Sequence, residues 1–192
     1  QVSNVNPTAA TSEMMSAPVD TVTSDYTVAT NNLHGMAPYM MAISFFIGGI
    51  VMCFVYPVFD PASLKPRNGI DWWASKASVW LLVALAQAVI EVSLLMLLNG
   101  LRPVDVAKTY MVAIISSLAF MSLISLFNVI LGKIGAFLML IFMILQLSGS
   151  AGTYPIEVTN GFYMKIRPYL PMTYSIDALR QTISMGSAGP GI

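Results

Sequence analysis

The sequence predicts an all-α polytopic membrane protein, a four-span helical bundle with a re-entrant and interfacial helix pair on its outer side. Three observations predict this class. Hydrophobic residues make up 56% of the 192 residues and charged residues only 9%, whereas soluble domains carry about 25% charged residues. Four long apolar stretches follow one another along the chain. Clusters of glycine and proline then interrupt the last stretch, as in spans that fold back into the membrane edge.

Charge and residue counts exclude several classes of function. Nine basic and nine acidic residues give a formal net charge of zero, which argues against a nucleic-acid partner. Cys53 and His34 are the only residues of their types, so a disulfide within the chain, a cysteine metal site and a His-based triad are excluded. No acid pair or Ser-Lys constellation is recognisable. We therefore predict no enzymatic activity, no catalytic residues, no cofactor and no metal.

The N-terminal segment differs from the rest of the chain. Residues 1–35 are rich in Thr, Ser, Asn and Ala and contain three acids but no Lys or Arg. We interpret them as the end of an extracellular stalk or domain. The chain starts at Gln1 without a charged-then-apolar leader, so we read it as a piece of a longer polypeptide.

The predicted transmembrane bundle occupies residues 36–150. About 20 helical residues cross a bilayer core of ~30 Å. The fourth stretch is shorter than the others, and taken alone it would also fit a buried helix of a soluble protein. Beside three longer stretches, we interpret it as a span. The four predicted spans are residues 36–59, 79–98, 110–131 and 134–150.

The link between the first two spans is basic and aromatic. If the N-terminus is outside, this link is cytoplasmic, in agreement with the positive-inside rule. The count of basic residues alone does not decide the orientation, which rests on the basic-free N-terminal tail. The tryptophans fit an anchor at the membrane interface, and Asn68 or Asp71 could cap a short helix that runs into the span. The alternative is a cytoplasmic docking element for a partner, formed by Lys65, Arg67, Trp72, Trp73 and Lys76.

Glu91 is the single ionisable residue deep in a predicted span. Gln87 precedes it by one helical turn, and Ala84 and Ala88 flank the same stripe, so this face is predicted to point inward. Two interpretations remain open: a site that responds to protons or substrate, and a hydrogen-bonded glutamate that locks helix packing. The candidate intramembrane polar site comprises Gln87, Glu91, Asn128 and Gln146.

Small residues spaced four apart predict close helix packing. Ser44 and Gly48 form such a pair in the first span, and Ala113 and Ser117 form one in the third. Small side chains let helix backbones approach where the hydrophobic effect gives no drive. These pairs are common in polytopic proteins, so they indicate a packed bundle rather than a particular substrate.

Residues 151–192 are predicted to form a re-entrant and amphipathic interfacial segment. Two short helices are expected, one over residues 160–167 and one that starts near Thr173 as its N-cap. The second helix has one apolar stripe, formed by Met172, Ile176, Leu179 and Ile183. A helix of this kind lies at the membrane interface. The residues that break the helices are Gly149, Gly152, Pro155, Pro168 and Pro171.

Three segments resemble the YhgE/Pip (phage infection protein) family, which belongs to the wider group of type-2 ABC exporter permeases. They are residues 146–157 (QLSGSAGTYPIE), 169–180 (YLPMTYSIDALR) and 34–40 (HGMAPYM). The resemblance implies that this chain is the tail of an extracellular domain plus four of five spans of a permease block. It also implies an outward re-entrant element at residues 149–155 and 168–173.

The resemblance implies two classes of function. The first is a permease-like subunit of a bacterial exporter, which moves a lipid-like or peptide substrate. No phosphate-binding loop occurs here, so its ATPase would be a separate polypeptide seated on residues 60–76. The second is a membrane platform for an extracellular domain that phage or a secretion machine engages. The resemblance implies it because family members include phage receptors and a relative, EsaA, accompanies type VII secretion. Both imply a multi-pass protein of the bacterial plasma membrane, in contact with lipid and self-associated or joined to further spans of its own chain.

Overall fold

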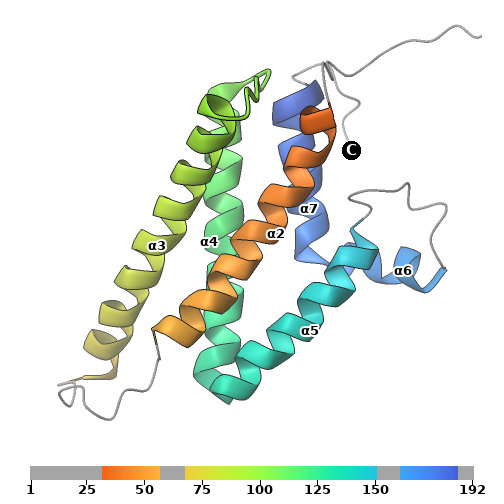
Figure 1. Ribbon diagram of the computed structural model, residues 1–192. Helices are drawn as coiled ribbons and strands as arrows, with labels where there is room; N and C mark the ends of the chain where they lie inside the picture. The colour runs from red at the N-terminus through yellow and green to blue at the C-terminus, as the bar shows by residue number, and fades with distance from the viewer. Residues whose placement is uncertain (1–31, 57–67, 151–160, 186–192) are drawn as a thin grey trace, which may run out of the picture.

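The computed structural model describes residues 32–56, 68–150 and 161–185, and its regular structure there is helical, as the sequence predicted. Figure 1 shows long helices that run side by side, followed by a broken terminal segment. The elements are α2 (Asn32–Val55), α3 (Gly69–Leu97), α4 (Val106–Leu131), α5 (Lys133–Gly149), α6 (Gly161–Ile166), the 3₁₀ turn η2 (Arg167–Tyr169), α7 (Pro171–Arg180) and the π turn η3 (Gln181–Met185).

Three of these helices are long and apolar enough to cross a membrane. α2, α3 and α4 contain 24, 29 and 26 residues, more than the roughly 20 that a bilayer core requires. The structure therefore supports a membrane-embedded protein. α5 has 17 residues and rises about 25 Å, short of the ~30 Å core. A fourth span thus stays a prediction.

The helix boundaries differ from the predicted spans. α2 begins at Asn32, inside the segment predicted as stalk, and ends at Val55 rather than at residue 59. The proline at position 57 disfavours helical backbone at Tyr56, which limits the helix. α3 begins at Gly69, ten residues before the predicted start at 79, so the interfacial helix and the span are continuous. Asn68 holds the N-cap position without a side-chain capping bond.

The core lies where α2, α4 and α7 meet. Phe46 and Phe120 are almost fully buried, and their rings pack edge to face with centroids 5.4 Å apart. α3 contacts mainly α4, through fully buried alanines at positions 84 and 88. Small residues at these contacts agree with the predicted close packing of the spans.

The turn between α4 and α5 depends on two glycines. Gly132 joins the helices at a φ of 60°, which glycine adopts without the strain of a side chain. A Cβ on Gly135 would collide with the backbone carbonyl oxygen of Phe127. α5 therefore starts in direct backbone contact with the last turns of α4.

α7 packs lengthwise against the first half of α2 and against α4 (Figure 1). Its predicted apolar stripe is confirmed as a buried face, since Met172, Ile176, Leu179 and Ile183 have no exposed surface. The predicted N-cap is wrong, because Leu170 holds that position and Pro171 is the first helical residue. Proline suits that position, since its φ is already helical and it lacks the N–H that would go unpaired.

Hydrogen bonds tie the end of the terminal segment to one end of the bundle. We call this the upper end, as Figure 1 shows it. Val104 N–H donates to Ile183 O and Asp105 N–H donates to Thr182 O, both at 3.2 Å. The Ser184 hydroxyl donates to His34 O at 3.2 Å. η3 therefore joins the α3–α4 link to the start of α2.

Candidate functional site

Glu91 pairs with Ser44 across the seam between α2 and α3. The Ser44 hydroxyl lies 2.5 Å from each Glu91 carboxylate oxygen. Glu91 is half-buried and Ser44 is exposed, so the pair lies at the edge of the bundle. Glu91 precedes Leu97, the last residue of α3, by six residues, or about 9 Å along the helix axis. The carboxylate is therefore closer to the upper end than to the middle of the helix.

Gln87 lies one turn deeper and connects three helices. Its Nε2 donates to Ser117 Oγ on α4 at 2.6 Å and to Phe45 O on α2 at 3.4 Å. The Ser117 hydroxyl donates in turn to Ala84 O on α3 at 2.8 Å. A Cβ on Gly48 would collide with Gln87 Oε1. Gln87 thus sits in close packing, which favours the helix-locking interpretation at this position.

Asn128 lies elsewhere, buried in the last turns of α4. Its Nδ2 has no hydrogen-bond partner among the described residues. Asn128 therefore belongs to the lower end of the bundle, next to the α4–α5 turn.

Gln146 lies at the junction of α5 and α7. Its Oε1 accepts a hydrogen bond from the Met172 backbone N–H at 3.1 Å, which satisfies one of the free N–H groups at the start of α7. Three buried polar atoms at this junction have no partner among the described residues: Gln146 Nε2, Ser150 Oγ and Thr173 Oγ1. The four predicted site residues therefore lie in three places, and only Gln87 and Glu91 are neighbours.

Sequence reasoning missed the hydrogen-bond partners of Gln87 and Glu91. Ser44 and Ser117 were recognised only as small packing residues, and the structure makes them the hydrogen-bond partners of Glu91 and Gln87. The serines themselves were the signal, because a serine at a close helix contact needs a hydrogen-bond partner for its hydroxyl.

The structure describes three of the five residues predicted to break the helices. Gly149 is the last residue of α5, and a Cβ there would meet the Leu170 side chain. Pro168 lies in η2, and Pro171 opens α7. Gly152 and Pro155 lie outside the described residues. The described part of the break is therefore a close contact between the end of α5 and the start of α7.

The predicted docking element lies on the first turns of α3. Trp73 is 62% exposed and Trp72 is half-buried. The Lys76 ammonium lies 4.3 Å from the ring centroid of Tyr56, at the end of α2, in a cation–π contact. Lys65 and Arg67 lie outside the described residues.

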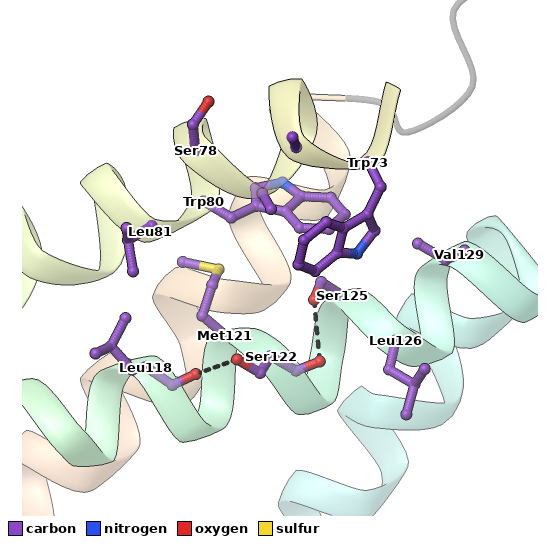
Figure 2. Close-up of a pocket in the computed structure, with 12 residues that line it drawn as sticks. Trp73, Ser78, Trp80, Leu81, Leu118, Met121, Ser122, Ser125, Leu126 and Val129 are labelled. Atoms are coloured by element: carbon purple, nitrogen blue, oxygen red, sulfur yellow. Dashed lines mark hydrogen bonds between the residues drawn. The ribbon is translucent and has the colours of Figure 1, made fainter. Parts of the chain in front are cut away.

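A groove of about 830 Å³ separates this part of α3 from the second half of α4 (Figure 2). The hydroxyls of Ser122 and Ser125 donate to backbone carbonyls of α4, so the lining offers mainly apolar surface. The groove exists because small residues line both of its walls. Sequence reasoning did not predict it, because it did not place the small residues of the two helices opposite one another. The groove is lined by Trp73, Ala74, Ala77, Ser78, Trp80, Leu81, Leu118, Met121, Ser122, Ser125, Leu126 and Val129. No group of three metal-ligating side chains gathers among the described residues.

Long apolar helices, a polar seam and a broken terminal segment are typical of a membrane-embedded helical protein. The chain is 39% identical over 155 residues to the uncharacterized protein YhgE of Bacillus subtilis (strain 168). This alignment covers 81% of the chain and supports its membership of the YhgE family, which the resemblance predicted. The chain spans about a fifth of the length of that relative. No family model and no solved structure matches it.

Proposed function

We propose that this chain is a permease-like subunit of a bacterial exporter of the type-2 ABC class, with a lipid-like or peptide substrate. The observation that carries the proposal is the position of α7. This ten-residue helix starts beside the end of α5 and packs along α2 and α4 within the bundle. Helices interrupted inside a membrane bundle are typical of transport proteins.

The junction of α5 and α7 supports this proposal. Interrupted backbone inside a membrane is tolerated only where protein or a water-filled cavity covers its polar groups. Gln146 covers the first free N–H of α7, while its own Nε2 has no partner among the described residues. A junction with spare hydrogen-bonding capacity can exchange partners as the helices move. We propose that it is the outward-side re-entrant element.

The orientation of the chain follows from the same proposal. With the N-terminus outside the plasma membrane, the upper end faces outward, and the α2–α3 link and the α4–α5 turn face the cytoplasm. A separate ATPase subunit would then dock beside Trp73 and Lys76. The exposure of Trp73 supports such a contact.

Purification of the full-length protein from its own bacterium, together with its neighbours, tests this function. An ATPase that copurifies in a fixed ratio supports the exporter. Trp73→Ala should then weaken its retention, while Leu82→Ala, a matched change of an exposed apolar residue further along α3, should not. Absence of any ATPase under conditions that preserve the membrane complex contradicts the exporter.

The second candidate function is a membrane platform for an extracellular domain that phage or secretion proteins engage. The close packing around Gln87 favours it, because a water-filled path at that level would leave room beside the side chain, and Gly48 and Ser117 leave none. Copurification of phage or secretion proteins in place of an ATPase would support the platform.

A further inference from the structure

The groove between α3 and α4 shares Trp73 with the proposed docking contact, and the rest of its lining takes no part in either proposed function. Figure 2 shows the Trp73 and Trp80 side chains on the α3 side, facing Met121 and Ser125 of α4. Its volume of about 830 Å³ falls within the roughly 300–1,000 Å³ of pockets that hold small molecules. An apolar space of this size between two membrane helices is suited to a hydrocarbon chain.

The groove opens towards lipid. Its walls belong to two helices that are long and apolar enough to cross the bilayer. The side chains of Leu81 and Leu126 line it and are 51% and 53% exposed. An acyl chain can therefore enter sideways without passing through the protein core.

The Trp80 ring lines the groove, but its indole nitrogen is not part of the open surface. The Trp80 Nε1–H is buried and has no acceptor among the described residues. The small exposed part of this side chain is therefore ring carbon, which adds to the apolar lining.

Charge at this end of the bundle fits a phosphate headgroup. Two basic residues lie at this end of the bundle outside the groove lining: Lys76 of α3, whose ammonium contacts the Tyr56 ring, and Lys133, the first residue of α5. Asp71 is the acidic residue of the first turn of α3. Basic groups between membrane helices attract lipid headgroups, and tryptophans favour that depth.

We propose that the groove binds one phospholipid of the surrounding bilayer. An acyl chain lies between α3 and α4, and the headgroup lies at the lower end of the bundle, where Lys76 and Lys133 are found. The site does not depend on export, because its ligand comes from the membrane and its walls are present in the chain alone.

Tryptophan fluorescence tests this site, because the chain has three tryptophans and two of them, Trp73 and Trp80, line the groove. Trp72→Phe and Trp73→Phe together leave Trp80 as the reporter. The chain is reconstituted in vesicles of phosphatidylcholine with dibrominated acyl chains or with ordinary ones. Bromine quenches indole emission on contact. Although Trp80 is only 7% exposed, it should lose most of its emission in the brominated vesicles.

Filling the groove should protect the reporter. Ala77→Phe places a ring in the groove and should restore most of the Trp80 emission in brominated vesicles. Ala74→Phe, on the same wall, is the second filler if the first variant loses its helix content. Ala86→Phe is the matched control, since Ala86 is exposed on α3 outside the groove, and it should leave the quenching unchanged.

Two results overturn the proposal. One is a Trp80 reporter that keeps its emission in brominated vesicles while a Trp73 reporter is quenched, which is expected if a second copy or another protein segment fills the groove. The other is equal quenching of Trp80 in the parent and in a folded filler variant, which is expected if lipid reaches the indole from elsewhere.

Discussion

At the residue scale, serines on neighbouring helices are the hydrogen-bond partners of Glu91 and Gln87. Glu91 and Gln87 were predicted to share a face from their spacing alone, and the burial of Ala84 and Ala88 confirms which side of that helix is inward. Which partners these polar residues meet depends on the rotation of α2 and α4 about their axes. That rotation is set by the whole bundle, so the bonds to Ser44 and Ser117 could not be predicted from the sequence.

Glu91→Gln should preserve the fold and change the pH dependence of export. The amide keeps the size of the side chain and can still bond to Ser44 but cannot ionise. The measurement is substrate efflux from vesicles, compared between parent and variant over about pH 5 to about pH 8. Identical profiles would remove the functional role of Glu91 and leave it as a packing residue.

Asp105 should stabilise α4 at neutral pH and cease to do so in acid. Its carboxylate caps the helix by accepting from the Lys108 N–H at 3.0 Å, and it lies 3.0 Å from the Lys108 ammonium. These contacts hold the pKa of Asp105 below its usual value, with the backbone bond as the main cause. A lowered folded-state pKa gives stability that is present above the unfolded-state pKa and lost as pH falls through the folded-state value.

Thermal unfolding of Asp105→Ala in detergent measures this effect. The variant should melt below the parent at neutral pH, and the two should converge in acid once the parent carboxyl is protonated. Asp105→Asn, which can still cap but carries no charge, should lie between them at neutral pH. A difference that stays constant down to acid pH would contradict the assignment.

At the element scale, proline and glycine decide where helices end and touch. The amphipathic stripe of α7 was predictable because spacing alone defines it, whereas its first residue was not. Thr173 has the chemistry of an N-cap, but Pro171 holds Leu170 in an extended conformation with a ψ of 109° and starts the helix two residues earlier. The groove was not predictable, because it depends on how α3 and α4 pack together.

Pro171→Ala should weaken the break between η2 and α7. Alanine releases Leu170 from the restriction that a following proline imposes, so the helix can extend towards Arg167. Limited proteolysis and circular dichroism measure the result, with a changed cleavage pattern near residues 167–171 and altered helix content expected. Unchanged protease sensitivity and helix content would count against a role for this proline.

Gly135→Ala should destabilise the contact between α4 and α5. The added Cβ meets a rigid backbone carbonyl, so α5 must shift, at a cost of about 1–3 kcal/mol. Gly69→Ala is the matched control, because a Cβ at Gly69 meets nothing within 4 Å. Thermal unfolding in detergent should show a clear loss for the first variant only. Equal behaviour of the two variants would show that the α4–α5 contact is looser than the structure implies.

At the scale of the whole molecule, composition alone predicted the class. Three helices exceed the length of a bilayer core, and large apolar side chains cover their outer faces. Whether α5 is a fourth span could not be settled from its composition, because its 17 residues lie at the lower limit for crossing. The similarity to YhgE supports the family and leaves export and its substrate as proposals.

The central claim is that lipid surrounds these helices, and spin-label accessibility tests it most directly. After Cys53→Ala removes the native thiol, labels are attached at Leu82→Cys and Ile115→Cys, whose parent side chains are 68% and 59% exposed. Lys108→Cys, in the first turn of α4 at the upper end of the bundle, is the control. In vesicles, the labels at positions 82 and 115 should collide with oxygen and be shielded from a water-soluble nickel complex, while the control meets nickel freely. Nickel access at Leu82 and Ile115 equal to that at Lys108 would contradict a membrane-embedded bundle.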